Sequence, residues 1–254
     1  MKHHVLITGA GGAIGRVACT HLLAAGHQVH SFDIGPGPVG VPHTFGSLSD
    51  AWRLNEAAQG CDTMIHLAAT PDIADMVTDL VPNNIIGTWN ALETARQVKM
   101  RRVVLASTMR VVSGLHKVGR DLITLADGYS THDAYALSKV MVEEMGRHAH
   151  QRHGMSIVCA RFACFLRTPR NAVDFRSMRE RDPAAGDRWY LSHDDCGRFL
   201  VAAVEHPDVT FAPVFVVSHN NGNHATDCVE SGKAVGWTPQ DSWPQGTPFA
   251  EANC

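Results

Sequence analysis

Short apolar runs alternate along the chain with longer segments in which apolar side chains recur every three or four residues. The short runs predict buried strands, and the longer segments predict amphipathic helices. We expect strands at 4–8, 28–33, 43–46, 62–69, 101–108, 155–163 and 212–219. We expect helices at 14–26, 49–60, 83–99, 133–153 and 192–206.

Turn and capping residues mark several boundaries of these elements. Gly26 is placed to end the first helix, and Pro82 is expected to separate a loop from the helix that follows it. Ser192 and Asp195 have the spacing of a capping box, in which each side chain accepts a hydrogen bond from the other residue's backbone N–H.

The alternation of strands and helices predicts an α/β fold. Parallel strands need crossover connections, and these are usually right-handed helices, so we expect a doubly wound parallel sheet. The regular alternation ends after about residue 165. We therefore expect residues 1–165 to form the core of the sheet. We expect residues 166–254 to form a small lobe that returns a helix and a strand to that core, as one structural unit.

Composition excludes several classes of function. The 254 residues carry 22 basic and 25 acidic side chains in a mixed pattern, so we expect no nucleic-acid partner. The longest apolar runs are far shorter than the ~20 residues of a membrane helix, and we expect no membrane partner. The chain begins "MKHHVLITG", without the pattern of a signal peptide.

Cysteine and histidine usage predicts a cytoplasmic protein without a metal site. The seven cysteines are scattered and form no CxxC pair, which is typical of reduced, mostly buried thiols. The histidines of "HAHQRH" (148–153) include neighbours two apart, which do not face each other on a helix. Positive charge near a helix end also suits the helix dipole, so we expect no metal ligands there.

A glycine-rich turn lies between the first predicted strand and the first predicted helix. "TGAGGAIGR" places Gly9, Gly12 and Gly15 at intervals of three, followed by the start of the helix. Such a turn admits the close approach of a pyrophosphate to the backbone and to a helix N-terminus. The spacing alone also fits an ordinary glycine-rich turn. As a dinucleotide site it would include Ala13 and Ile14.

Asp33 favours the dinucleotide interpretation. It ends the second predicted strand eighteen residues after Gly15, where a carboxylate accepts hydrogen bonds from ribose hydroxyls. A turn aspartate is the alternative. The carboxylate would repel the extra phosphate of NADP, and Ile34 and Gly35 bring no arginine to bind it, so NAD is the expected cofactor.

The turn, together with Tyr135-x-x-x-Lys139, is typical of the short-chain dehydrogenase/reductase superfamily, and the chain resembles its extended branch, which is NAD-dependent epimerase/dehydratase-like. The motifs that carry this resemblance are "TGAGGAIG", "HLAA" (66–69), "NNIIGTWNALE" (83–93), "VVLAST" (103–108) and "AVGWTPQ". The resemblance implies a dinucleotide-binding Rossmann core in residues 1–165 and a small substrate lobe after it. It also implies cofactor contacts at Leu67, Ala68 and Ala69. Leu48 is expected near adenine, although Ser47 departs from the aspartate that many members have before that leucine.

The resemblance assigns a reaction to Tyr135 and Lys139. Residues i and i+4 share a helix face, so Lys139 lies beside Tyr135. The ammonium and the oxidised cofactor are expected to lower the tyrosine pKa from its usual value of about 10. Tyr135 would take the proton of a substrate alcohol, and Thr108 would hold the same oxygen, with Ser107 as the reserve candidate. A packing tyrosine and a solvated lysine are the alternative. By the same resemblance, Tyr135 and Lys139 are also expected to contact the cofactor.

The substrate is expected to be small and anionic. The C-terminal part is short for a nucleotide-sugar enzyme, and "RTPRNAVDFRSMRERDPAAGDR" (167–188) holds six arginines, whose planar cations suit carboxylate or phosphate. The chain is most similar to uronate dehydrogenases, including the segment "WYLSHDD". That family has Ser-Asn-His where this chain has Thr108-Met109-Arg110, which indicates a different substrate. Candidate substrate-binding residues are Thr70, Ser107, Met109, Arg110 and Arg188.

Two other functions remain open from the sequence. The first is a nucleotide-sugar epimerase, dehydratase or ketoreductase of the same superfamily, which would hold its cofactor tightly. The second is a non-catalytic NAD-binding sensor, although such proteins typically lose the tyrosine or the lysine. By resemblance we also expect a homodimer or a larger homo-oligomer that pairs through the helix carrying Tyr135 and Lys139.

Overall fold

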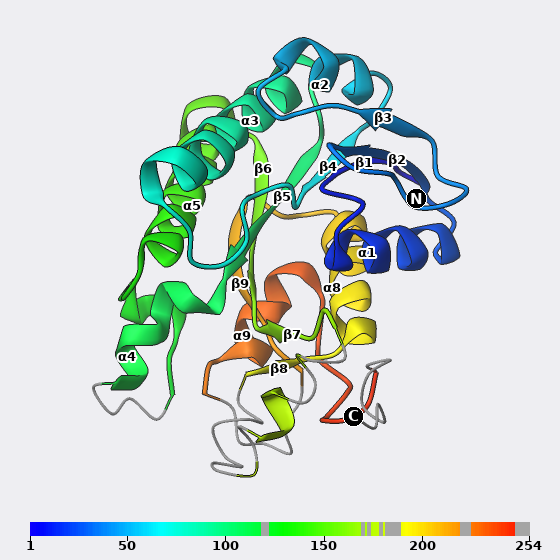
Figure 1. Ribbon diagram of the computed structural model, residues 1–254. Coiled ribbons are helices and arrows are strands. Elements are labelled where there is room, and N and C mark those ends of the chain that lie inside the picture. Colours follow the sequence, from blue (N-terminus) through cyan, green and yellow to red (C-terminus); the bar gives the residue numbers. More distant parts are fainter. Residues whose placement is uncertain are drawn as a thin grey trace.

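A parallel sheet forms the centre of the protein in its computed structural model (Figure 1). The structure describes residues 1–117, 122–168, 171, 174–177, 180, 189–218 and 225–246. Its sheet has seven strands in the order β3-β2-β1-β4-β5-β6-β9. The strands are β1 (His4–Thr8), β2 (Gln28–Asp33), β3 (His43–Phe45), β4 (Thr63–His66), β5 (Arg102–Thr108), β6 (Ser156–Phe162) and β9 (Phe211–Val216). Every neighbouring pair is parallel, which confirms the doubly wound fold.

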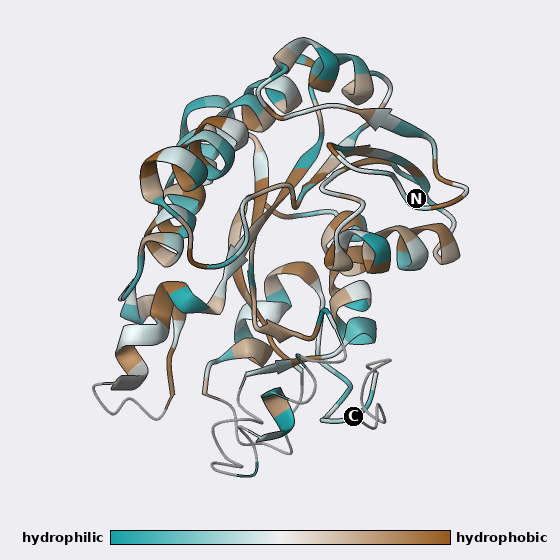
Figure 2. Ribbon diagram, in the orientation of Figure 1, coloured by the Kyte–Doolittle hydropathy of each residue, from teal (hydrophilic) through white to brown (hydrophobic). Residues whose placement is uncertain are grey.

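Helices cover both faces of this sheet. On one side α1 (Ala13–Ala24) packs against α8 (His193–Glu205). On the other side α3 (Gly87–Gln97) packs between α2 (Ala51–Ala58) and α5 (Ala134–His153). Each face has its own apolar core, one around Ile7 and Phe199 and the other around Leu6 and Leu105. Figure 2 shows mainly apolar residues along the central strands and a mixture of apolar and polar residues on the helices.

Shorter elements complete the described chain. They are η1 (Met76–Ile86), η2 (Met109–Val112), α4 (Ser113–Lys117), η3 (Leu125–Asp127), β7 (Cys164–Phe165), β8 (Tyr190–Leu191), α9 (Cys228–Gly232) and η4 (Lys233–Val235). β7 and β8 form a separate two-stranded parallel sheet. After residue 165 the chain supplies α8 and β9 to the central layers. The division into a core and a small lobe at this residue stays a prediction.

Pro82 does not separate a loop from a helix as predicted. It lies inside η1, a π-helix that begins at Met76 and runs directly into α3. Asp75 caps the start by accepting hydrogen bonds from the N–H groups of Val77 and Thr78. Gly87 N–H donates to the Pro82 carbonyl five residues earlier. We attribute the tolerance of proline to this wider turn, because an α-helical interior would place the ring against a carbonyl.

β4 also differs from its predicted length. It ends at His66, and the predicted continuation at 67–69 leaves the sheet. The backbone of Leu67 still donates to the Thr8 carbonyl of β1, at 3.0 Å. The three residues after His66 therefore stay close to β1 while their backbone turns away from the strand direction.

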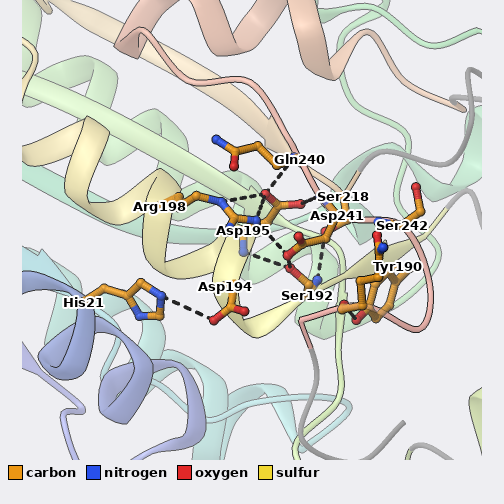
Figure 3. A network of polar contacts seen from close by, with 11 residues as sticks. His21, Tyr190, Ser192, Asp194, Asp195, Arg198, Ser218, Gln240, Asp241 and Ser242 are labelled. Atoms are coloured by element: carbon orange, nitrogen blue, oxygen red, sulfur yellow. Dashed lines mark hydrogen bonds and ion pairs between the residues drawn. The ribbon is translucent and has the colours of Figure 1, made fainter. Parts of the chain in front are cut away.

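The predicted capping box at α8 is only half formed (Figure 3). Asp195 N–H donates to the Ser192 hydroxyl at 2.8 Å, as expected. Ser192 N–H, however, donates to Ser218. The Asp195 carboxylate instead accepts hydrogen bonds from the backbone N–H groups of Gln240 and Asp241, at 2.9 and 3.0 Å, and forms an ion pair with Arg198. A fully buried carboxylate thus fastens the C-terminal segment to the start of α8.

Neither a membrane span nor a metal cluster is found in the described part of the chain. No helix there is long and apolar enough to cross a membrane. No three histidine, cysteine, aspartate or glutamate side chains among those residues gather in a group that could hold a metal ion.

Asp195 is expected to be a major contributor to stability. Asp195→Ala leaves two backbone N–H groups without their acceptor and removes one of the two carboxylate partners of Arg198, so we expect the free energy of unfolding to fall by about 3–5 kcal/mol. The neighbouring Asp194, 54% exposed and paired with His21, is the matched control. Asp194→Ala is expected to cost less than about 1 kcal/mol. Urea unfolding followed by circular dichroism measures both. Equal losses would contradict the anchoring role of Asp195.

Candidate active site

One large cavity opens at the carboxyl ends of the central strands. Its volume is about 810 Å³. Parallel strands bring the residues that follow β1, β2, β4, β5 and β6 to this same edge, where ligands of open α/β sheets bind. The predicted site residues on its lining are Gly9, Gly12, Ala13, Ile14, Gly15, Asp33, Ile34, Leu48, Leu67, Ala68, Ala69, Thr70, Ser107, Thr108, Arg110, Tyr135 and Lys139.

The glycine-rich turn is packed so tightly that Gly9 and Gly15, among others, exclude a side chain. Gly9 has φ +73°, and a Cβ there would lie 2.6 Å from the backbone nitrogen of Ala68. A Cβ at Gly15 would lie 2.4 Å from the Gly9 carbonyl oxygen. Gly12 is the N-cap of α1 and offers no side chain to the first N–H groups of the helix. These groups therefore face the cavity with the positive end of the helix dipole.

Asp33 holds the rim of this turn. Its carboxylate accepts hydrogen bonds from the backbone N–H groups of Gly11 and Gly35, at 2.8 and 2.9 Å. A Cβ at Gly11 would lie 2.8 Å from the Pro36 carbonyl. Gly11 was missed in the sequence because the three-residue spacing passes over it, although it stands within the quoted motif. The same carboxylate thus orders the loop and faces the cavity.

The wall after β4 is fixed by asparagines of η1. Asn84 is fully buried and accepts a hydrogen bond from Thr70 N–H at 2.8 Å. Its amide nitrogen donates to the Thr70 carbonyl and to Ser138 of α5. Asn83 donates to the Thr70 hydroxyl at 2.8 Å. These contacts tie the loop to α5. The sequence motif contained both asparagines without indicating this role.

Thr108, Tyr135 and Lys139 meet at the inner end of the cavity. Lys139 is buried, and its ammonium donates to the Ala106 carbonyl at 2.9 Å and lies 5.9 Å from the centre of the Tyr135 ring. Burial lowers the pKa of Lys139 to about 8. A hydrogen bond between the side chains of Thr108 and Tyr135 favours the ionised phenol. Thr108 and Tyr135 are therefore close enough to hydrogen-bond to one oxygen atom, and the Lys139 ammonium lies beside the ring.

The electrostatics of Tyr135 differ from the sequence-based expectation. Burial raises its pKa, and this effect outweighs the opposing positive charges of Arg110 and Arg167. The expected lowering by Lys139 is not found in the protein alone. The lysine donates instead to a backbone carbonyl of β5. Additional positive charge beside the ring is thus needed to favour the phenolate.

Ser107, the reserve candidate, is bound to a buried ion pair. Its hydroxyl donates to Glu143 at 2.5 Å, and Arg161 donates two hydrogen bonds to the same carboxylate at 2.9 Å each. Glu143 follows Lys139 by four residues on α5 and is fully buried. Ser107 lines the cavity, but its proton is already donated, so Thr108 is the better placed hydroxyl.

Two of the predicted substrate contacts are not placed at the cavity. Met109 is 3% exposed and packs with Val111 and Phe215 in an apolar cluster. It is not among the residues that line the cavity, because the turn η2 carries the side chain into the core, and its contact with the substrate stays a prediction. Arg188 lies outside the described residues.

Other cavity-lining residues were missed in the sequence. Asp72, Cys164, Phe165 and Arg167 line the cavity, and the charges of Asp72 and Arg167 act on Tyr135. Arg167 begins the arginine-rich stretch, which was a usable signal. Asp72 follows the "HLAA" motif closely, but nothing in its surroundings in the sequence indicated that its charge acts on Tyr135.

Comparisons with known proteins agree with this geometry. L-arabinose 1-dehydrogenase (NAD(P)(+)) of Haloferax volcanii is 28% identical over 253 residues, which cover 94% of this chain and 96% of that protein. Uronate dehydrogenase of Pseudomonas syringae pv. tomato is 27% identical over 225 residues, covering 86% and 75%. The crystal structure of glucuronic acid dehydrogenase from Chromohalobacter salexigens aligns with a TM-score of 0.80 at 26% identity, covering 95% and 86%.

The family assignment rests on more than half of the chain. Residues 5–166, from β1 to the segment after β7, match a single family. This span includes the glycine-rich turn, Asp33, Thr108, Tyr135 and Lys139. The chain belongs to the NAD dependent epimerase/dehydratase family, whose members are extended short-chain dehydrogenases/reductases.

Proposed function

We propose that the protein is an NAD-dependent oxidoreductase that transfers a hydride between nicotinamide and the alcohol or carbonyl carbon of a small, anionic, sugar-like substrate. One observation carries this proposal. Thr108, Tyr135 and Lys139 line the same cavity as the glycine-rich turn and Asp33. A proton-transfer group and a dinucleotide cradle in one cavity are what alcohol oxidation requires.

The residues of the cavity fit NAD. The glycine-rich turn leaves no room for side chains at Gly11, Gly9 and Gly15, while the start of α1 presents free N–H groups that suit a pyrophosphate. Asp33 is placed to accept hydrogen bonds from ribose hydroxyls and to repel the extra phosphate of NADP. When bound, NAD supplies the hydride acceptor and a positive charge near Tyr135.

The side chains of this protein would then accept the proton that the substrate loses. Tyr135 takes the proton of the substrate hydroxyl, and the Thr108 hydroxyl holds the same oxygen. Lys139 has three N–H groups, and one donates to Ala106, which leaves two for other partners. With a pKa of about 8 its ammonium stays mainly charged at neutral pH. The buried lysine therefore supports the phenolate once the site is filled.

Two arginines support an anionic substrate. Arg110 and Arg167 both line the cavity beside Tyr135, and their positive charges act on its phenol. Relatives that act on uronates and on L-arabinose make a small sugar or sugar acid the preferred class. Thr70 brings a further hydroxyl to the lining of the cavity.

A nucleotide-sugar epimerase is the second candidate, because the family includes epimerases and dehydratases. It would retain its cofactor and cause no net reduction of added NAD. A non-catalytic sensor is less well supported, since Tyr135 and Lys139 are both present and both line the cavity. We further propose a cytoplasmic location, because five of the six described cysteines are buried thiols without a disulfide.

Tyr135→Phe tests the proton transfer. The variant keeps the ring but lacks the hydroxyl, so we expect kcat to fall at least ~10²-fold while the Kd for NAD changes less than two-fold. Initial rates of NAD reduction and a fluorescence titration measure the two quantities. Tyr190→Phe is the control, because that hydroxyl donates to Gln245 and Tyr190 does not line the cavity. Retained turnover in Tyr135→Phe would remove Tyr135 from the reaction.

Asp33→Asn tests the cofactor preference. Asparagine still accepts one backbone hydrogen bond but carries no charge, so we expect KM for NAD to rise about 10-fold and the NAD/NADP preference in kcat/KM to fall by at least as much. Asp50→Asn is the control, since asparagine caps α2 as well as aspartate does. If Asp33→Asn keeps the wild-type preference, the ribose assignment is wrong.

We also propose that the protein forms a homo-oligomer through α3, η1 and α5, which contact one another. Ile86, Trp89, Leu137 and Met141 on these elements are 40–51% exposed despite being apolar. Trp89→Arg is expected to convert the assembly to monomers, as measured by sedimentation velocity. Trp52→Arg on α2, where the tryptophan is 68% exposed, is the control and should not change the sedimentation coefficient. A monomeric wild-type protein would contradict this proposal.

A further inference from the structure

Arg110 lies between two carboxylates at the cavity. Its guanidinium donates to Asp72 at 2.6 Å and to Asp133 at 2.9 Å. It also lies over the ring of Tyr135, 5.5 Å from the centroid. The arginine that is expected to bind a substrate anion is therefore already paired twice.

The two carboxylates are held very differently. Asp133 is 17% exposed and also caps α5, where it accepts a hydrogen bond from Ala136 N–H at 2.8 Å. Asp72 is 60% exposed and lies in the short segment between β4 and η1. Its backbone has φ +67°, a conformation that is uncommon for residues other than glycine. Asp133 is thus a fixed partner of Arg110, whereas Asp72 is the one that can be displaced.

A second cation lies close to the same acid. Arg167 also lines the cavity, and it forms no hydrogen bond with the residues that the structure describes. Its charge nevertheless acts on Asp72 and on Tyr135. Arg110, Arg167, Asp72 and Asp133 together carry no net charge. An anion that enters beside Tyr135 meets a neutral group of side chains as long as Asp72 remains in place. Once Asp72 leaves, the group carries one positive charge and Arg110 has a free pair of donors.

We propose that Asp72 determines substrate specificity. Its carboxylate occupies the position on Arg110 that a carboxylate or phosphate group of the substrate takes, and this group displaces Asp72 when the substrate binds. Neutral sugars have no group that can replace the Asp72 carboxylate on the guanidinium, and they bind with the pair intact. The kinetic part of this inference rests on the proposed dehydrogenase function, whereas the binding part does not.

Asp72→Asn tests this role. Asparagine tolerates the left-handed backbone and keeps the shape of the side chain, but it lacks the charge that competes for Arg110. Initial rates of NAD reduction are measured with glucuronate, glucose 6-phosphate and glucose. We expect KM for the anion that fits, carboxylate or phosphate, to fall about 10-fold. KM for glucose should change less than two-fold, and kcat should change little.

Two further variants make the interpretation specific. Asp79→Asn removes an equal charge from the neighbouring helix η1, at a residue that does not line the cavity, and should leave all KM values unchanged. In an Arg110→Gln background Asp72→Asn should lower no KM further, because the two residues act as a pair. The proposal would be overturned if, in Asp72→Asn, neither the KM for glucuronate nor the KM for glucose 6-phosphate falls. A rise for glucose as well would mean that Asp72 binds a substrate hydroxyl.

A binding measurement separates this inference from the proposed function. If wild-type protein reduces NAD with none of the three sugars, the dehydrogenase proposal fails for this class. Titration calorimetry of NAD-loaded protein with glucuronate and with glucose 6-phosphate then decides about Asp72. A Kd about 10-fold lower in Asp72→Asn for either anion supports the displaced carboxylate. Equal Kd values, or no binding to either protein, overturn it.

Discussion

The parallel pairing of the central strands is the constraint on which the cavity depends. Thr8 pairs with His66 across β1 and β4, and Thr108 pairs with Phe162 across β5 and β6. Because all of these strands run in one direction, the residues that follow them emerge at a single edge. The glycine-rich turn, the wall after β4 and the hydroxyl of Thr108 thus become neighbours although a hundred residues separate them. The backbone hydrogen bonds of the sheet set these positions.

Close approach of helices to this sheet sets the depth of the cavity. A Cβ at Gly146 would lie 2.7 Å from Leu105 and 3.0 Å from Ile157, so glycine allows α5 to lie directly on β5 and β6. Lys139, two turns earlier on the same helix, can then reach the carbonyl of Ala106. In the same way, glycine at position 15 allows α1 to pack directly against the backbone of Gly9 and Ala10 in the turn. Tight backbone packing therefore places both the glycine-rich turn and the buried lysine at the cavity.

Burial controls the electrostatics at the inner end of the cavity. It lowers the pKa of Lys139 and raises that of Tyr135, so each group is less readily charged than in water. The buried pair Glu143–Arg161 holds the Ser107 hydroxyl, which leaves Thr108 as the hydroxyl beside the tyrosine. At the outer end Arg110 is neutralised by Asp72 and Asp133. The cavity thus combines a buried tyrosine and lysine with a group of arginines and aspartates whose charges balance.

The order of the elements, the doubly wound fold and the residues of the turn follow from the sequence, because periodicity and glycine spacing act over a few neighbouring positions. The sequence also placed Thr108 at the end of a strand and Tyr135 and Lys139 in the helix after it. The tertiary fold, by contrast, settled that Met109 is buried, that Pro82 lies within a helix and that Ser107 is bound to Glu143. It alone revealed Asp72 on Arg110, thirty-eight residues apart in the chain. Such contacts depend on which side chains meet across elements, and no local pattern in a single sequence records that.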